Sequence, residues 1–184
     1  MLDQAGVPYR QADPNVDETA IKIRLRGAGA DAAQIAKFLA EQKALAVAQN
    51  LAAGDLVIGA DQVLDCGGLF YDKPRDRTDA RTQLKALRGR SHELISACAV
   101  VQGATVDWTH MERVTLHMRE VSDAFLERYL DALGDRALAG PGAYQLEGLG
   151  AQLFDRVDGD FFAVLGLPLL PLLGYLRSQG ALPS

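Results

Sequence analysis

Asp61 is the first residue whose position suggests chemistry. It directly follows Leu56–Ala60, a continuous apolar run that is typical of a strand buried on both faces. In open α/β sheets ligands bind beyond the carboxyl ends of strands, so a carboxylate at this place is suited to act as a catalytic base or a metal ligand. The alternative interpretation is an ordinary polar residue in the turn that ends the strand.

Lys43 lies in an apolar stripe. It is spaced by four residues from its neighbours Leu39 and Val47, so all three share one face of a predicted helix. A lysine in such a stripe costs free energy unless its ammonium reaches a partner or a pocket. The alternative is a buried aliphatic stem with the charge in water.

Three further residues carry groups that suit a phosphate or a proton. Lys73 precedes Pro74, which favours an extended backbone at the lysine and could hold its ammonium over a phosphate; the alternative is a solvated lysine in a turn. Arg90 could bind a phosphate through its guanidinium fork. His92 could act as a general base, although a single histidine at the start of a strand also fits a structural role.

Two glutamates complete the candidates. Glu18 lies where carboxylates are favoured, in the first turn of a predicted helix. Glu147 lies in the segment Gly142–Gly148, whose glycines let the backbone approach a ligand closely. A carboxylate there could accept hydrogen bonds from a nucleobase or bind a metal. The sequence has no phosphate-binding P-loop and no GxSxG or HExxH pattern, which removes several common enzyme classes.

Helices and strands mix along the chain, and these elements must position the candidates. Gly6 is expected to cap the tail of a helix, and Pro8–Asp13 is expected to be a short strand. Caps and periodicity predict helices from about Val16 to Arg26, Asp31 to Leu51, Thr78 to Leu87, Ser122 to Leu133, and Pro168 to Gln179. The other predicted strands are Leu56–Ala60, a hairpin of Glu93–Val101 and Thr105–Met118, and Gln152–Val157, with a loop and a possible strand in Gly140–Gly150. This order predicts an α/β fold with a twisted, mixed sheet flanked by helices.

The composition narrows the functional classes. With 184 residues, 48% of them hydrophobic and 23% charged, the chain is expected to fold as one domain; two small domains are the alternative. Its net charge of -5 argues against a nucleic-acid-binding surface. The longest uncharged run, Phe161–Leu176, contains two prolines and is shorter than the roughly 20 residues of a membrane span. No secretory signal is visible, and Cys66 and Cys98 are expected to be reduced thiols of a cytoplasmic protein.

The order of these motifs is more specific than any of them alone. In chain order they are Val16–Glu18, Lys43–Ala44, Ile58–Val63, Lys73–Pro74, Leu87–His92, Gly142–Gly148 and Gly159–Leu169. This series resembles the Maf family of nucleoside triphosphate pyrophosphatases over nearly the whole chain. The resemblance implies a Maf/inosine-triphosphatase-like architecture.

The resemblance also implies an activity and its residues. We expect a cytoplasmic, homodimeric, house-cleaning enzyme that cleaves a nucleoside triphosphate between its α and β phosphates and needs a divalent metal, Mg²⁺ or Mn²⁺. Asp61 would be the proton acceptor and would bind the metal together with Glu18. Substrate-binding residues would be Lys43, Lys73, Arg90, Gln62 and Glu147.

Two departures from the family pattern matter. The family opens with a strand and a phosphate-binding Ser-x-x-x-Arg-Arg-like segment, so residues 1–184 are interpreted as a single Maf-like domain without its first strand and the start of its first helix. This leaves a non-catalytic nucleotide-binding or division-regulating protein as the alternative. Gln62 after Asp61, and Glu147 before Gly148, resemble the subgroup that acts on 7-methyl-GTP.

Overall fold

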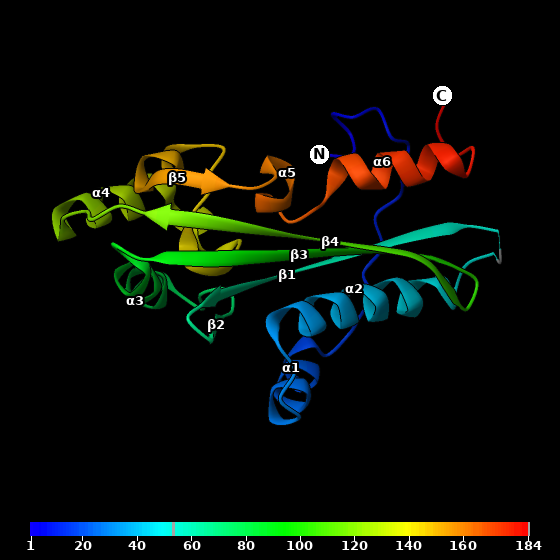
Figure 1. Cartoon of the computed structure of the whole chain (residues 1–184), viewed down its shortest axis with the longest axis horizontal. Helices are drawn as coiled ribbons and strands as arrows, with labels where there is room; N and C mark the ends of the chain where they lie inside the picture. Colours follow the sequence, from blue (N-terminus) through cyan, green and yellow to red (C-terminus); the bar gives the residue numbers. More distant parts are fainter. Residues whose placement is uncertain (53, 184) are drawn as a thin grey trace. The chain divides into compact units, whose positions relative to one another are not determined.

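The computed structural model describes residues 1–52 and 54–183, which form two compact units. The first unit comprises Met1–Gln62, Ser96–Glu112 and Gly166–Ser184, and the second comprises Val63–Ile95 and Arg113–Leu165. One five-stranded sheet has the order β2-β1-β3-β4-β5. Its long strands β1 (Leu56–Cys66), β3 (Ser91–Gln102) and β4 (Thr105–Met118) each contribute residues to both units (Figure 1).

The remaining elements divide between the units. The first unit contains α1 (Glu18–Gly27), α2 (Ala32–Ala48) and α6 (Leu169–Ser178). The second contains β2 (Leu69–Tyr71), α3 (Arg77–Leu87), α4 (Asp123–Leu133), the 3₁₀ helices η1 (Gly134–Leu138), η2 (Pro141–Ala143) and η3 (Leu149–Leu153), β5 (Phe154–Asp158) and α5 (Phe161–Val164).

The sheet is antiparallel. β1 pairs with β2 in this way, with Leu64 opposite Tyr71, and β4 pairs with β5, with Leu116 opposite Val157. The turn after β3 is too short for the crossover that a parallel neighbour would need. The α/β class and the flanking helices are therefore confirmed, and the sheet that was expected to be mixed has the antiparallel arrangement.

Strand β1 differs from its prediction in two ways. It continues through Asp61 to Cys66, so Asp61 lies in the middle of the strand and not beyond its carboxyl end. Its residues alternate between fully and partly buried from Leu56 to Val63, so the run Leu56–Ala60 is not equally buried on both faces. A short apolar run does not reveal this difference, because the degree of cover on each face depends on the helices that pack there.

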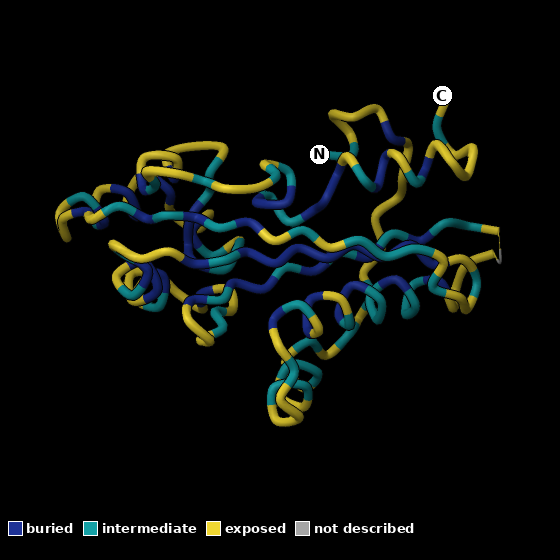
Figure 2. The backbone as a smooth tube through the Cα atoms, viewed as in Figure 1, coloured by how far each residue is buried: buried dark blue, intermediate teal, exposed yellow. Residues whose placement is uncertain are grey.

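In the first unit, helices pack on both faces of the sheet. Figure 1 shows α2 against one face and α6 against the other, and Figure 2 shows that the side of α2 toward the strands is buried. A Cβ atom added to Gly59 of β1 would lie 2.2 Å from the carbonyl oxygen of Ala40 in α2. The missing side chain of Gly59 thus allows α2 to approach β1 closely. Toward α6, Trp108 of β4 stacks on Tyr175 with ring centroids 5.1 Å apart.

The second unit has its own apolar core. Helices α3 and α4 contact each other, and their leucines are buried together with inward-facing residues of the strands. This core includes Leu64, Leu84, Leu116, Leu126 and Leu130.

Most helix predictions are confirmed, including the caps Asp31 and Ser122. Helix α3 is capped by Asp76 and not by Thr78. Asp76 accepts a hydrogen bond from the N–H of Asp79, as a cap must.

Smaller predictions had mixed outcomes. Gly6 has the expected left-handed backbone, but it ends a hydrogen-bonded turn. Residues 8–13 form no strand, and 140–150 contain 3₁₀ helices instead of a strand. Both cysteines are free thiols, as predicted. In the described part of the chain, no helix is long and apolar enough to cross a membrane.

Candidate active site

Three of the predicted site residues form one charged cluster in the first unit. The ammonium of Lys43 lies 2.6 Å from Oδ1 of Asp61 and 2.8 Å from Oε1 of Glu18. The side chain of Asp61 is only 6% exposed, whereas that of Glu18 is 41% exposed. Lys43 therefore pairs with a buried carboxylate and a more accessible one, and the alternative of an ammonium in open water does not hold.

Local sequence places each member of this cluster. Asp17 caps α1 by accepting the N–H of Ala20, which puts Glu18 in the first turn. Gly59 and Asp61 are two residues apart in β1, so they lie on the same face of the strand, toward α2. Since α2 passes close to β1 at Gly59, Lys43 is near enough to reach Asp61 and also the carbonyl oxygen of Ala60, at 3.5 Å.

Burial and charge act against each other in this pair. Burial raises the pKa of Asp61 above its ordinary value, and the nearby ammonium of Lys43 offsets only part of this effect. Burial alone would lower the pKa of Lys43, but Asp61 and Glu18 together raise it. The result is an ammonium that holds its proton more tightly than usual beside a carboxylate that is easier to protonate than usual.

Asp61 also carries an oxygen without a partner. Its Oδ2 atom is buried and accepts no hydrogen bond from any residue that the structure describes, which is costly unless a ligand or a proton donor satisfies it. Oε2 of Glu18 lies 3.8 Å from the ammonium of Lys22, one helical turn further along α1. Sequence reasoning missed Lys22, which a Glu–Lys pair at i and i+4 could have indicated.

The donor set fits a hard divalent cation only with help from a ligand. Within residues 1–52 and 54–183, no group of three or more His, Cys, Asp or Glu could hold a metal by itself. Asp61 and Glu18 supply carboxylate oxygens, and Mg²⁺ is typically held by one or two carboxylates plus phosphate oxygens and water. The free Oδ2 of Asp61 is consistent with such a shared site.

Gln62 does not join the cluster. It follows Asp61 along the strand and so points to the opposite face of β1, where its Nε2 donates to Oγ of the fully buried Ser96 at 2.8 Å. Sequence reasoning did not single out Ser96, and nothing in its local pattern would have done so.

The other four candidates, Lys73, Arg90, His92 and Glu147, lie in the second unit. Lys73 is exposed in the loop between β2 and α3, and Glu147 is exposed in the turn before η3. Arg90 is exposed just before β3, and one of its guanidinium nitrogens would lie 3.4 Å from a Cβ added to Gly67. The loop positions of Lys73 and Glu147 agree with the sequence analysis, and their roles stay predictions.

His92 is buried in the core of the second unit. Its Nε2 lies 2.7 Å from the hydroxyl of Tyr144, and its ring also contacts Phe154. Burial lowers the pKa of His92 to about 4, with a smaller contribution from His117. This setting agrees with the structural alternative for His92.

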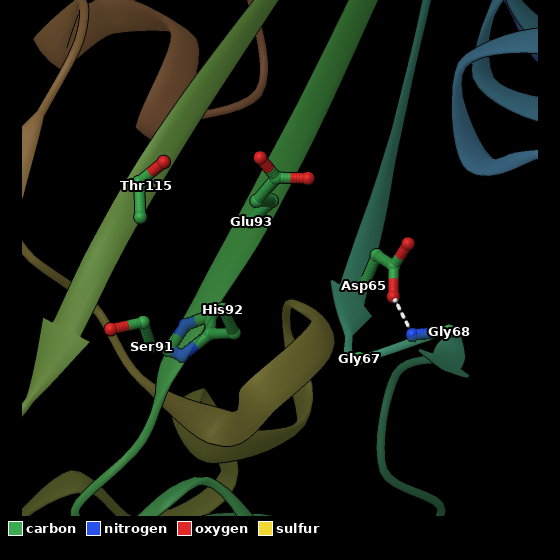
Figure 3. A pocket seen from close by; sticks show the side chains of 7 residues that line it. All are labelled: Asp65, Gly67, Gly68, Ser91, His92, Glu93 and Thr115. Carbon is green, nitrogen blue, oxygen red and sulfur yellow. Dashed lines mark hydrogen bonds between the residues drawn. The ribbon is translucent and has the colours of Figure 1, made fainter.

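A cavity of about 300 Å³ also lies in the second unit. Figure 3 shows side chains from β3 and β4 on one side of it and the turn after β1 on the other, where Asp65 accepts a hydrogen bond from the N–H of Gly68. Its lining residues are Asp65, Gly67, Gly68, Ser91, His92, Glu93 and Thr115. Of the candidates from the sequence, only His92 is among them.

Comparison with known proteins identifies the family. A family model described as Maf-like protein matches residues 1–179. A protein of Paramagnetospirillum magneticum named nucleoside triphosphate pyrophosphatase is 48% identical over 182 residues, which cover 99% of this chain and 93% of the relative. One of Rhizobium meliloti named 7-methyl-GTP pyrophosphatase is 44% identical over 184 residues, covering 100% of this chain and 92% of the relative. On this match over nearly its whole length, the chain belongs to the Maf-like protein family.

Proposed function

We propose that this chain hydrolyses the α–β phosphoanhydride of nucleoside triphosphates and releases a nucleoside monophosphate and pyrophosphate. The names of its relatives support the reaction class. The observation that carries the proposal is the cluster of Lys43, Asp61 and Glu18, in which the buried carboxylate of Asp61 has one unpartnered oxygen beside a fixed ammonium.

Each member of the cluster has a role in this reaction. The carboxylate of Asp61 accepts a proton from water as the water oxygen bonds to the α-phosphorus. The bond from that phosphorus to the bridging oxygen breaks, and its electron pair leaves with pyrophosphate. Without a bound cation, burial raises the pKa of Asp61 above that of an ordinary carboxylate, which favours proton uptake. The ammonium of Lys43 stabilises negative charge that develops on the phosphate oxygens.

We propose that Asp61 and Glu18 also hold a divalent cation, Mg²⁺ or Mn²⁺, together with phosphate oxygens of the substrate. When bound, this cation would add positive charge beside the phosphates. The family and the donor set support a divalent cation in general, and Mg²⁺ and Mn²⁺ are proposed because both bind carboxylate and phosphate oxygens.

The remaining substrate contacts are proposed from residue chemistry and the family resemblance. Lys73 and Arg90 are suited to phosphate oxygens, and Gln62 is proposed to bind the substrate as well. Glu147 is suited to guanine, since a carboxylate accepts hydrogen bonds from its N1 and N2 donors and favours the positive ring of 7-methylguanine. This gives a preference for 7-methyl-GTP, a substrate that the names of some relatives carry and others do not.

Two broader expectations belong to the same proposal. We propose that residues 1–184 act as a single Maf-like domain and that the chain forms a homodimer. Sedimentation of the purified chain would show twice the mass of one 19.8 kDa protomer, and a single-protomer mass at micromolar concentration would contradict the dimer.

The decisive experiment measures pyrophosphate release from a panel of nucleotides that includes 7-methyl-GTP, GTP, dTTP and UTP, with Mg²⁺ or Mn²⁺. Asp61→Asn should lower kcat by roughly 10³-fold, because it removes the proton acceptor. Asp65→Asn, on the same strand and outside the cluster, is the matched control and should keep kcat within about threefold. Nucleotide binding by calorimetry without turnover would instead support the non-catalytic alternative, and full activity of Asp61→Asn would exclude Asp61 as the base.

A further inference from the structure

Gln83 is a buried polar residue that the proposed mechanism does not use. It lies on α3, is only 7% exposed, and uses both ends of its amide. Its Nε2 donates to the backbone carbonyl of Asp72 at 3.0 Å, and its Oε1 accepts the backbone N–H of Gly142 at 3.0 Å. All three residues belong to the second unit.

These two hydrogen bonds join loops that carry proposed substrate-binding residues. Asp72 directly precedes Lys73, and Gly142 begins the segment that leads to Glu147. We name residues 72–76 the Lys73 loop and residues 142–148 the Glu147 loop. We propose that Gln83 is a positioning residue that fixes these two loops relative to each other. This inference rests on the proposed function, because it assigns both loops to nucleotide binding.

The chemistry of the amide restricts which residue can do this. One partner is a carbonyl that needs a donor, and the other is an N–H that needs an acceptor, so a side chain must present both groups. A leucine of similar size would remove both hydrogen bonds and would take from the buried N–H of Gly142 its side-chain acceptor, which favours movement of the loops. A glutamate would keep the acceptor for Gly142 but place a carboxylate oxygen against the carbonyl of Asp72.

Further contacts connect the position of Gly142 to the rest of the Glu147 loop. Gly142 has a left-handed backbone with φ of 81°, and a Cβ there would lie 2.5 Å from the ring of Tyr144. The hydroxyl of Tyr129 donates to the carbonyl of Ala143 and accepts the N–H of Gln145, both at 3.3 Å. Two residues beyond Gln145 lies Glu147, so displacement at Gly142 is expected to move its carboxylate.

Hydrogen exchange of the substrate-free protein tests the structural part directly. In Gln83→Leu, exchange should become at least tenfold faster both at the Gly142 amide and in a peptide covering 72–76. In Gln83→Glu, only the peptide covering 72–76 should exchange faster. Leu84→Ala, a fully buried neighbour on the same helix, is the control that loosens packing without removing either hydrogen bond. Unchanged exchange of both loops in Gln83→Leu, or equal acceleration in Leu84→Ala, would overturn the proposal.

Kinetics test the functional part. Gln83→Leu should raise KM about tenfold with kcat within about threefold of the parent, which is the pattern of lost substrate positioning with intact chemistry. It should also reduce the preference between 7-methyl-GTP and UTP, whereas Gln83→Glu should raise KM and retain that preference. Leu84→Ala should leave KM and preference unchanged below its melting temperature. If KM and preference of Gln83→Leu match the parent, the positioning role is wrong; if the parent releases no pyrophosphate from any nucleotide, the proposed function fails while the exchange result still stands.

Discussion

Lys43 holds its charge at a place where burial disfavours it, and this is what makes the cluster informative. Its ammonium is satisfied by Asp61 and Glu18, and of these two carboxylates only Asp61 is buried. A buried ion pair of this kind contributes little to stability compared with apolar residues of the same volume. Its presence in a closely packed helix–strand contact therefore favours a chemical role over a structural one.

His92 gives a pH-dependent stability that can be measured. Its pKa is lowered from 6.5 to about 4 by burial, so between these values the unfolded chain binds a proton that the folded chain does not. Stability should therefore fall as pH falls through this window, by about 2 kcal/mol between pH 7 and pH 5. Urea unfolding at the two pH values, with the parent and His92→Gln, measures this contribution.

The comparison of the two proteins isolates His92 from other titrating groups. Burial raises the pKa of Asp61, which acts in the opposite direction, but this effect is common to both proteins. His92→Gln should lose most of the acid-dependent decrease. An equal decrease in both proteins would show that His92 does not keep a depressed pKa in the folded state.

At this scale the sequence predicted some partners and not others. The apolar stripe around Lys43 indicated that its ammonium needs a partner, and the structure supplies Asp61 and Glu18. The depth of Asp61 and the contact of Gln62 with Ser96 depend on which strand and helix lie next to them, and local sequence does not contain this information. The contact of His92 with Tyr144 joins residues 52 positions apart, so local sequence could not predict it either.

At the scale of elements, the contact of α2 with β1 determines the site. Gly59→Ala would place a Cβ 2.2 Å from the carbonyl oxygen of Ala40 and 2.8 Å from the amide nitrogen of Ala44. Since both are backbone atoms, the helix must move away, and Lys43 moves with it. We expect a loss of about 3 kcal/mol in the free energy of unfolding and a fall of at least tenfold in kcat/KM, measured by urea unfolding and pyrophosphate release.

Gly174 provides the matched control for this substitution. It lies inside α6, and a Cβ there would meet nothing within 4 Å. Gly174→Ala should leave activity unchanged and stabilise the protein by about 0.5–1 kcal/mol, because alanine loses less backbone entropy in a helix. If Gly59→Ala behaved like Gly174→Ala, the close approach of α2 would not be needed for the cluster.

Helices were easier to predict than strand limits, for a physical reason. Caps such as Asp31 and Ser122 act within three residues and leave a local signal. The end of β1 leaves none, because the chain through Asp61 stays extended only while neighbouring strands supply its hydrogen bonds. The 3₁₀ helices of the Glu147 loop, including the left-handed Ala143, likewise depend on partners such as Gln83 and Tyr129 in distant elements.

At the scale of the whole molecule, the order of the motifs predicted the family through its resemblance, and the order of helices and strands predicted the α/β class. The chain length left two small domains as the alternative to one, but it did not predict which segments form each unit. Chain segments alternate between the units, and strands β1, β3 and β4 belong to both, so no boundary in composition marks a linker between them. A compact unit made of discontinuous segments has no signature in local sequence.

These shared strands predict one cooperative unfolding transition, even though each unit has an apolar cluster of its own. Trp108, the single tryptophan, stacks on Tyr175 in the first unit, so its fluorescence reports that unit, whereas far-ultraviolet circular dichroism reports both.

Leu126→Ala removes a fully buried side chain of the second unit and should cost about 3 kcal/mol in the free energy of unfolding. If each of the strands β1, β3 and β4 folds over its full length at once, the loss of stability in Leu126→Ala should lower the urea midpoint of Trp108 fluorescence as much as the midpoint of circular dichroism. Leu39→Ala, equally buried in the first unit, should shift both midpoints in the same way. A fluorescence midpoint that stays at the parent value in Leu126→Ala would mean that the first unit unfolds independently and that its strands do not need their continuation in the second.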